Sequence, residues 1–169
     1  HDILIPAIES GLHLLIEKPL CTTLDDCREI ADLVATRPVE QVIWMGLEYR
    51  YMPPLRRLMV EIAAGTTGNI KMVAIREHRF PFLVKVDNCN RFSKNTGGTL
   101  VEKCCHFFDL MRLLTKSEPV QVMASAGQSV NHLDEVYDGQ TSDIWDNGYV
   151  IVDFANGTRA MLELCMFAE

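Results

Sequence analysis

The sequence predicts an α/β segment that forms part of a doubly wound parallel sheet, followed by an α+β segment with a mostly antiparallel open sheet. Three observations predict this fold class. Short apolar runs alternate with segments of helical periodicity up to about residue 50. After a turn-rich stretch at residues 65–69, apolar and polar residues alternate as in half-exposed strands. An Asn-Gly pair then separates two of these strands in the manner of a hairpin.

The first elements are a helix and a strand in direct succession. Residues 3–10 read as the end of a helix, and Gly11 stops it as a C-terminal glycine does. The apolar run 12–16 follows at once. Because this run shows no alternation, we expect a strand buried on both faces of a parallel sheet.

A second helix and a second strand complete the first segment. Thr23 offers an N-cap with Asp26 three residues later, and apolar residues recur at helical spacing up to Thr36. The apolar run 41–46 predicts the next strand. The order helix, strand, helix, strand describes part of a doubly wound sheet, and we assign it residues 1–50.

The second segment, residues 51–169, begins with a helix that Pro53 and Pro54 open and that ends at Gly65. The Asn-Gly pair predicts a tight turn in which both central residues have positive φ. One continuous helix over residues 100–114 is expected to cross the sheet. The predicted strands of that sheet are residues 70–80, 120–125, 149–154 and 159–167.

Composition and charge exclude several functions. The chain has 16 Lys and Arg against 23 Asp and Glu, a net charge of −7, and its basic residues form no stripe, so nucleic acid is excluded as a partner. No apolar run approaches the roughly 18 residues that a membrane span needs. The six cysteines are sparse and lie mostly in apolar segments, which predicts reduced thiols in a cytoplasmic protein. Because His1 is not preceded by a Met or a signal core, we expect a piece of a longer protein.

The helix at 100–114 carries the first group of candidate functional residues. Glu102, His106 and Asp109 fall within about 60° of one another around the helix axis. Such a stripe is costly to bury unless it is hydrogen-bonded or lines a cleft. Spacing alone favours a solvated face, with Glu102 stabilised near the helix start. A metal shared by Glu102 and His106 is discounted because no further ligand lies at a suitable spacing.

The second candidate is Glu17-Lys18-Pro19, directly after the predicted strand 12–16. Ligands of open α/β sheets bind at the carboxyl ends of strands, so a lysine there is placed to reach a substrate or cofactor. The alternative is a solvated lysine at a strand end, with the proline forcing a turn.

Together these motifs resemble the glucose-fructose oxidoreductase, inositol dehydrogenase and rhizopine-catabolism (Gfo/Idh/MocA) family. The resemblance rests on Glu17-Lys18-Pro19, on GLEYRYMP at residues 46–53, and on Gly97-Gly98 ahead of EKCCHFFDL at residues 102–110. The turn at 65–70 and the hairpin at 156–158 also resemble the family pattern, in the same order. The resemblance covers essentially the whole chain.

The resemblance implies a fold and an activity. Residues 1–50 would be the C-terminal part of a Rossmann domain that binds NAD or NADP, and the open sheet of the second domain would mediate a homo-oligomer. The activity would be a hydride transfer between nicotinamide and a sugar, polyol or related carbonyl compound. The proton moved in that reaction suits a His, and a Lys can polarise the oxygen.

The family pattern also implies residue roles. Lys18 would touch the nicotinamide and the reacting oxygen, His106 would be the general acid/base, and Asp109 would orient His106 or bind substrate. Glu102 is the fourth implied catalytic residue and stands where many members have Asp. The implied cofactor contacts are Glu17, Lys18, Pro19 and Arg50.

One departure from the family keeps alternatives open. None of the ten glycines forms G-x-G-x-x-G, so the pyrophosphate-binding turn is absent from this sequence. An NAD-dependent glycoside hydrolase of the same fold, or a truncated chain that acts only in assembly, are the other readings. The candidates for a sugar or polyol pocket are Arg50, Tyr51, Arg76, His78, Arg79 and Trp145.

Overall fold

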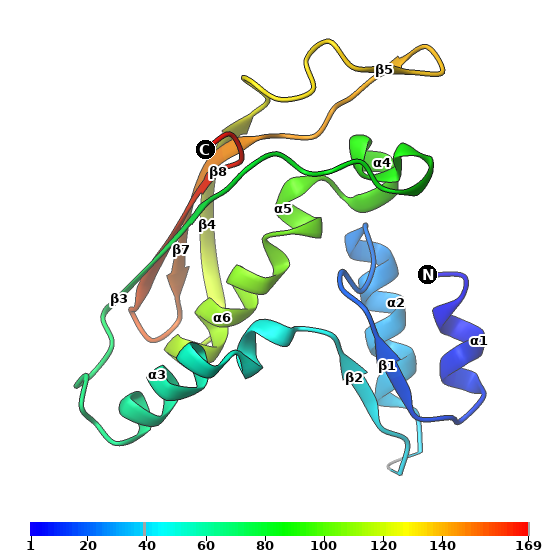
Figure 1. Ribbon diagram of the computed structural model, residues 1–169. Coiled ribbons are helices and arrows are strands. Elements are labelled where there is room, and N and C mark those ends of the chain that lie inside the picture. Colours follow the sequence, from blue (N-terminus) through cyan, green and yellow to red (C-terminus); the bar gives the residue numbers. More distant parts are fainter. Residues whose placement is uncertain (39, 169) are drawn as a thin grey trace.

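The computed structural model describes residues 1–38 and 40–168. The chain begins with the predicted order of a helix, a strand, a helix and a strand: α1 (Leu4–Glu9), β1 (Leu14–Ile16), α2 (Leu24–Ala35) and β2 (Ile43–Met45). The two strands pair in parallel (Figure 1). The Thr23 side chain accepts a hydrogen bond from the Asp26 backbone N–H at 3.2 Å, so the predicted N-cap of α2 is confirmed.

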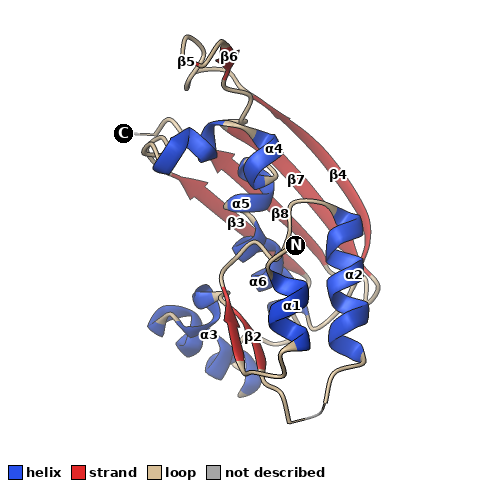
Figure 2. Cartoon of the chain, turned by 90° about the vertical axis from the view of Figure 1, so that its right-hand side faces the viewer, coloured by secondary structure: helices blue, strands red, loops and turns tan. Residues whose placement is uncertain are grey.

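The two-stranded sheet is covered on one face, not on two. Leu14 and Ile43 pack with α1 and α2 around the buried Ile8 and Ile30. Leu15 points the other way and is 72% exposed. In the part of the chain that the structure describes, β1 is therefore buried on one face only, where the sequence predicts burial on both. Within the described residues the two helices that pack on this sheet lie on the same side of it (Figure 2), so alternate strand residues find no covering layer.

A 3₁₀ turn, η1 (Glu48–Tyr51), leads into α3 (Pro53–Ala63). Proline occupies the first helical positions, where its missing N–H costs nothing. Gly65 follows the helix with φ +77°, a conformation that glycine adopts without strain. The predicted helix and its stop are confirmed.

The second sheet contains β3 (Met72–His78), β4 (Pro119–Gly127), β7 (Asn147–Phe154) and β8 (Arg159–Cys165). Their order is β3-β8-β7-β4; β3 pairs with β8 in parallel, and the other two pairs are antiparallel. The sheet is thus mixed and mostly antiparallel, as predicted. A short hairpin of β5 (Val136–Tyr137) and β6 (Gln140–Thr141) projects beyond it (Figure 1).

The turn between β7 and β8 differs from the predicted one. Gly157 has φ +81°, but Asn156 does not lie in the left-handed region. The Phe154 carbonyl accepts from the Gly157 N–H at 2.9 Å. The Asn156 side-chain oxygen accepts from the Thr158 N–H at 3.0 Å. The hairpin is confirmed, but glycine alone supplies the positive φ, because Asn156 caps the chain with its side chain instead.

The predicted helix at 100–114 is interrupted. After η2 (Val86–Arg91) and α4 (Ser93–Thr96), the chain forms α5 (Thr99–Glu102) and then α6 (Cys105–Thr115), with a break at Lys103 and Cys104. Cys104 is completely buried in the core beneath the sheet, whereas the Lys103 ammonium donates to the Tyr49 hydroxyl at 2.6 Å. The break thus coincides with opposed contacts of two neighbouring residues, which helical periodicity does not register.

Helix α6 packs on one face of the second sheet and forms the main core. The core residues on the sheet alternate along the strands, as residues of one face must. They pack against Phe107 and Met111 of α6, and they are Val150, Val152, Phe154, Ala160, Leu162 and Leu164. None of the helices in the described ranges has both the length and the apolar character needed to cross a membrane.

Candidate active site

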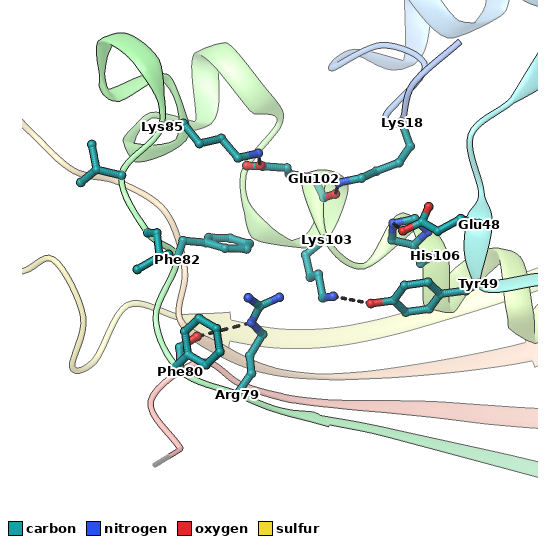
Figure 3. Close-up of a pocket in the computed structure, with 12 residues that line it drawn as sticks. Lys18, Glu48, Tyr49, Arg79, Phe80, Phe82, Lys85, Glu102, Lys103 and His106 are labelled. Carbon is teal, nitrogen blue, oxygen red and sulfur yellow. Dashed lines mark hydrogen bonds and ion pairs between the residues drawn. The ribbon is translucent and has the colours of Figure 1, made fainter. Parts of the chain in front are cut away.

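A pocket of about 370 Å³ lies where the two parts of the chain meet (Figure 3). Its walls come from the end of β1, from η1, from the segment after β3, and from the break between α5 and α6. A neighbouring hollow of about 430 Å³ shares Lys18, Lys85 and Glu102 with it. The residues that line the first pocket are Lys18, Glu48, Tyr49, Arg79, Phe80, Phe82, Leu83, Val84, Lys85, Glu102, Lys103 and His106.

Lys18 stands two residues beyond β1, at the carboxyl end of the parallel strands. Its ammonium donates to the backbone carbonyl of Glu102 at 2.9 Å. The Glu102 side chain is turned toward Lys85, with which it forms an ion pair. Glu102 therefore holds two lysines, one through its carbonyl and one through its carboxylate, and the structure brings together two predicted site residues that lie 84 positions apart.

The neighbours of Lys18 in the sequence lie at the same strand end. The Lys18–Pro19 peptide bond is cis, and Pro19 lines the neighbouring hollow. Glu17 is exposed. A Cβ added to Gly46 would lie 3.2 Å from both the Glu17 carboxylate and the Ile16 carbonyl, a tight contact that would require the neighbouring atoms to shift slightly.

His106 is buried and lies face to face with Tyr49. Their ring centroids are 4.3 Å apart and their planes differ by 9°. The imidazole Nε2 lies 3.5 Å from the Glu48 carboxylate, whereas Nδ1 is buried without a hydrogen-bond partner among the described residues. Burial, with the nearby charges of Lys18 and Lys103, lowers the pKa of His106, although Glu48 and Asp109 oppose the shift. The imidazole is thus a neutral proton acceptor near neutral pH.

Asp109 is engaged by Arg50. Both guanidinium edge nitrogens donate to the two carboxylate oxygens, a bidentate pair that raises the pKa of Arg50. No hydrogen bond joins Asp109 to His106 in the described part of the chain, and neither Asp109 nor Arg50 lines the pocket. Both predicted site residues thus lie beside the pocket in the sequence, Arg50 directly after the lining residue Tyr49 and Asp109 three residues after the lining residue His106.

The polar stripe is not a solvated face, and that interpretation is wrong. Glu102, His106 and Asp109 are 5%, 2% and 9% exposed. Each meets a partner from a distant segment: Glu102 meets Lys18 and Lys85, His106 stacks on Tyr49, and Asp109 binds Arg50. Spacing within one helix carries no information about these partners.

Sequence reasoning missed Lys85 and Lys103. The Lys103 ammonium, beside its bond to the Tyr49 hydroxyl, lies 3.2 Å from the Glu77 carboxylate. Lys103 stands next to Glu102 in the sequence, and its side chain lines the pocket at the point where the helix is interrupted. Lys85 lies between β3 and η2, where periodicity offers no signal.

Of the six residues suggested for a sugar pocket, the structure places only Arg79 in the pocket wall. Arg76 and His78 both pair with Glu163 on the opposite face of β3. Tyr51 contacts Trp44, and Trp145 lines a separate hollow beside Gly97 and Gly98. Within residues 1–38 and 40–168, no cluster of three His, Cys, Asp or Glu side chains is arranged to hold a metal ion.

Family models match both parts of the chain. Residues 61–169 match the C-terminal alpha/beta domain of the Gfo/Idh/MocA oxidoreductase family, and residues 1–44 match the NAD-binding Rossmann fold of the same family.

Individual proteins give the same assignment at low identity. The chain is 26% identical over 154 residues to the rhizopine catabolism protein MocA of Rhizobium meliloti, across 91% of this chain and 44% of that protein. It is 28% identical over 161 residues to the inositol 2-dehydrogenase of Rhizobium meliloti strain 1021, across 95% of this chain and 45% of that protein. The chain thus spans less than half the length of these curated relatives.

A solved structure shows the same fold. The WlbA dehydrogenase from Bordetella pertussis, in complex with NADH and UDP-GlcNAcA, superposes with a TM-score of 0.77 and 17% identity. The superposition covers 97% of this chain and 48% of that one.

Proposed function

The chain belongs to the Gfo/Idh/MocA oxidoreductase family, and on that premise we propose that it supplies the reaction pocket of an NAD(P)-dependent dehydrogenase. The reaction would transfer a hydride between nicotinamide and a sugar, polyol or related carbonyl compound. The observation that carries the proposal is the meeting of Lys18, from the first part of the chain, and His106, from the second, in the wall of one pocket.

The residues at the strand ends suit a nicotinamide cofactor. They stand at the carboxyl ends of parallel strands, where open α/β sheets bind nucleotides. Lys18 lines both hollows at this edge. Glu17, Lys18 and Pro19 would hold the nicotinamide end, with Arg50 as a further predicted contact. The bound cofactor would accept or donate the hydride.

His106 would move the proton. In the oxidation direction the substrate C–H carbon loses a hydride, and its hydroxyl loses a proton to the neutral imidazole while the C=O bond forms. Because Nδ1 is enclosed, Nε2 is the nitrogen that would take this proton. In the reverse direction the imidazolium returns it to the oxygen.

Lys18 would stabilise the oxygen as negative charge develops on it. Lys18 is partly buried, and a charged donor in such a position stabilises an alkoxide more than it would in water. Its bond to the Glu102 carbonyl occupies one of its three donor hydrogens and directs the others. Glu102 and Asp109 would act as positioning residues. Glu102 would orient Lys18 through its carbonyl. Asp109, which Arg50 holds, would fix the helix that carries His106.

The test uses the protein expressed from the longest reading frame that contains this chain. NADH and NADPH formation would be followed by absorbance with inositols, hexoses and their sugar alcohols and acids. The proposal predicts net reduction of NAD or NADP with at least one member of the panel. Release of an alcohol from a glycoside without net change in NADH would instead identify a glycoside hydrolase.

A further inference from the structure

The charge of the pocket opposes the charge of the protein. The chain carries a net charge of −7. The pocket wall nevertheless contains four cations, Lys18, Arg79, Lys85 and Lys103, against the two carboxylates of Glu48 and Glu102. Such a local reversal of sign attracts ligands of the opposite charge.

Part of this positive charge is neutralised in place. The Glu102 carboxylate pairs with Lys85. Glu48 has a well-exposed side chain and lies beside His106, where solvent screens its charge. Neither carboxylate forms an ion pair with Arg79 or Lys103 in the described part of the chain.

Arg79 and Lys103 share a single carboxylate. Glu77 lies 3.2 Å from the Lys103 ammonium and 3.8 Å from the Arg79 guanidinium. The side chains of Lys103 and Arg79 are 11% and 25% exposed, and Figure 3 shows them reaching toward the same part of the pocket from opposite walls. Burial lowers the pKa of Lys103, but the Tyr49 hydroxyl and the Glu77 carboxylate raise it by more. The net shift is upward, so the ammonium stays charged. Among the described residues, one positive charge of this pair therefore has no counter-ion.

Two aromatic rings lie beside Arg79. Its guanidinium lies 5.0 Å from the Phe80 ring centroid and 5.4 Å from that of Phe82. Aromatic faces orient a guanidinium and keep its nitrogens available to a planar anion. The hydrogen bond that the Arg79 side chain donates to the Phe80 carbonyl is long at 3.4 Å.

From this geometry we propose that Arg79 and Lys103 bind an anionic group, a carboxylate or a phosphate, on the substrate. That the ligand is a sugar or polyol rests on the proposed function. That it carries an anionic group rests only on the positions and charges of Arg79 and Lys103. A guanidinium binds either anion through two parallel hydrogen bonds, and the ammonium adds a second charge. Lys103 also touches Tyr49, on which His106 is stacked, so the anion would anchor a substrate whose reacting oxygen lies at His106.

The test titrates the 169-residue chain with D-glucuronate, D-glucose 6-phosphate and D-glucose, followed by NMR chemical shifts. At least one anion should bind about tenfold or more tightly than glucose. Tighter binding of glucuronate identifies a carboxylate as the ligand group, and tighter binding of the phosphate identifies a phosphate. Either result supports the site.

Variants show whether the proposed residues carry the preference. Arg79→Gln and Lys103→Gln should each reduce it about tenfold or more. Arg76→Gln, which changes a residue of β3 that is paired with Glu163 on the other face, should leave the preference unchanged. Equal binding of all three ligands, no saturable binding of either anion, or an unchanged preference in both pocket variants would overturn the proposal.

The two proposals fail in different ways. In the first case, the protein from the longest reading frame shows no turnover of NAD(P) while the 169-residue chain keeps an Arg79-dependent preference for anions. The dehydrogenase proposal then fails and the anion-site proposal stands. If the protein from the longest reading frame oxidises neutral sugars as well as their acids, and Arg79→Gln leaves the KM for the acids unchanged, the anion-site proposal fails and the dehydrogenase proposal stands.

Discussion

Tyr49 contacts two of the buried ionisable side chains of the pocket, His106 and Lys103. Its ring lies flat on the imidazole of His106, with centroids 4.3 Å apart, and its hydroxyl accepts a hydrogen bond from Lys103 at 2.6 Å. Tyr49 comes from η1, whereas Lys103 lies in the break between α5 and α6, and His106 lies in the first turn of α6. One side chain from the N-terminal part thus holds both groups of the C-terminal part.

Tyr49→Phe and Tyr49→Leu should separate these two contacts. The phenylalanine variant would keep the stack and lose the hydrogen bond of a buried ammonium, at a cost of about 1–2 kcal/mol in the free energy of unfolding. The leucine variant would also lose the aromatic contact, for about 0.5–1.5 kcal/mol more. Urea denaturation of the chain measures both. Equal stability of the two variants would show that the stack contributes nothing.

Asp109→Ala should destabilise the chain by about 1–3 kcal/mol, because it leaves the Arg50 guanidinium without its bidentate partner beside a buried helix face. The matched control is Asp153→Ala, which removes the carboxylate from the more exposed pair with Arg159. That change should cost about 0–1 kcal/mol. The same urea denaturation compares the two variants. A larger loss of unfolding free energy for Asp153→Ala than for Asp109→Ala would contradict the conclusion that the Arg50–Asp109 pair is the more stabilising of the two.

Gly97→Ala and Gly139→Ala distinguish backbone strain from steric contact. Both glycines have positive φ, +76° and +79°. A Cβ at Gly97 would lie 2.7 Å from the Val101 side chain, whereas a Cβ at Gly139 would meet nothing within 4 Å. Gly139→Ala should cost about 1 kcal/mol. Gly97→Ala should cost about 1–3 kcal/mol more, because α5 must shift. Equal melting temperatures of the two variants would contradict this.

Glu135 should give a pH-dependent part of the stability. Burial opposes ionisation, but hydrogen bonds from His132, Tyr137 and Arg91 lower the pKa of Glu135 to about 2. A lowered folded-state pKa stabilises the chain above the unfolded value of about 4.3, and this contribution is lost as pH falls toward 2. Glu135→Gln should therefore be less stable than the wild type at about pH 6, with the difference shrinking in acid. A constant difference from about pH 6 to about pH 3 would exclude this linkage.

Local patterns predicted most of the elements but not their surroundings. The Thr23 cap, the proline start of α3 and the alternation of β3 are properties of neighbouring residues, and the structure confirms them. The exposure of Leu15 depends on which layers cover β1, and the partner of Lys103 in the helix break is Tyr49, 54 positions away. Information of that kind is absent from a periodicity.

The site shows the same division. Spacing favoured a solvated stripe for Glu102, His106 and Asp109, and only the family resemblance indicated that they are functional. Their burial comes from partners such as Lys18 and Arg50, which lie far away in the sequence. The sequence around Lys85 and Lys103 gives no local signal, because the residues that flank a lysine are alike whether it lies on an exposed surface or in a pocket wall.

The most direct measurement of the central claim is the turnover of His106→Ala in the protein from the longest reading frame that contains this chain. If His106 moves the proton in an NAD(P)-dependent oxidation, kcat should fall roughly 10²–10⁴-fold. His78→Ala, which removes an exposed histidine paired with Glu163 on the outer face of β3, should leave kcat unchanged. A His106→Ala protein that oxidises substrate at the wild-type rate would contradict the account.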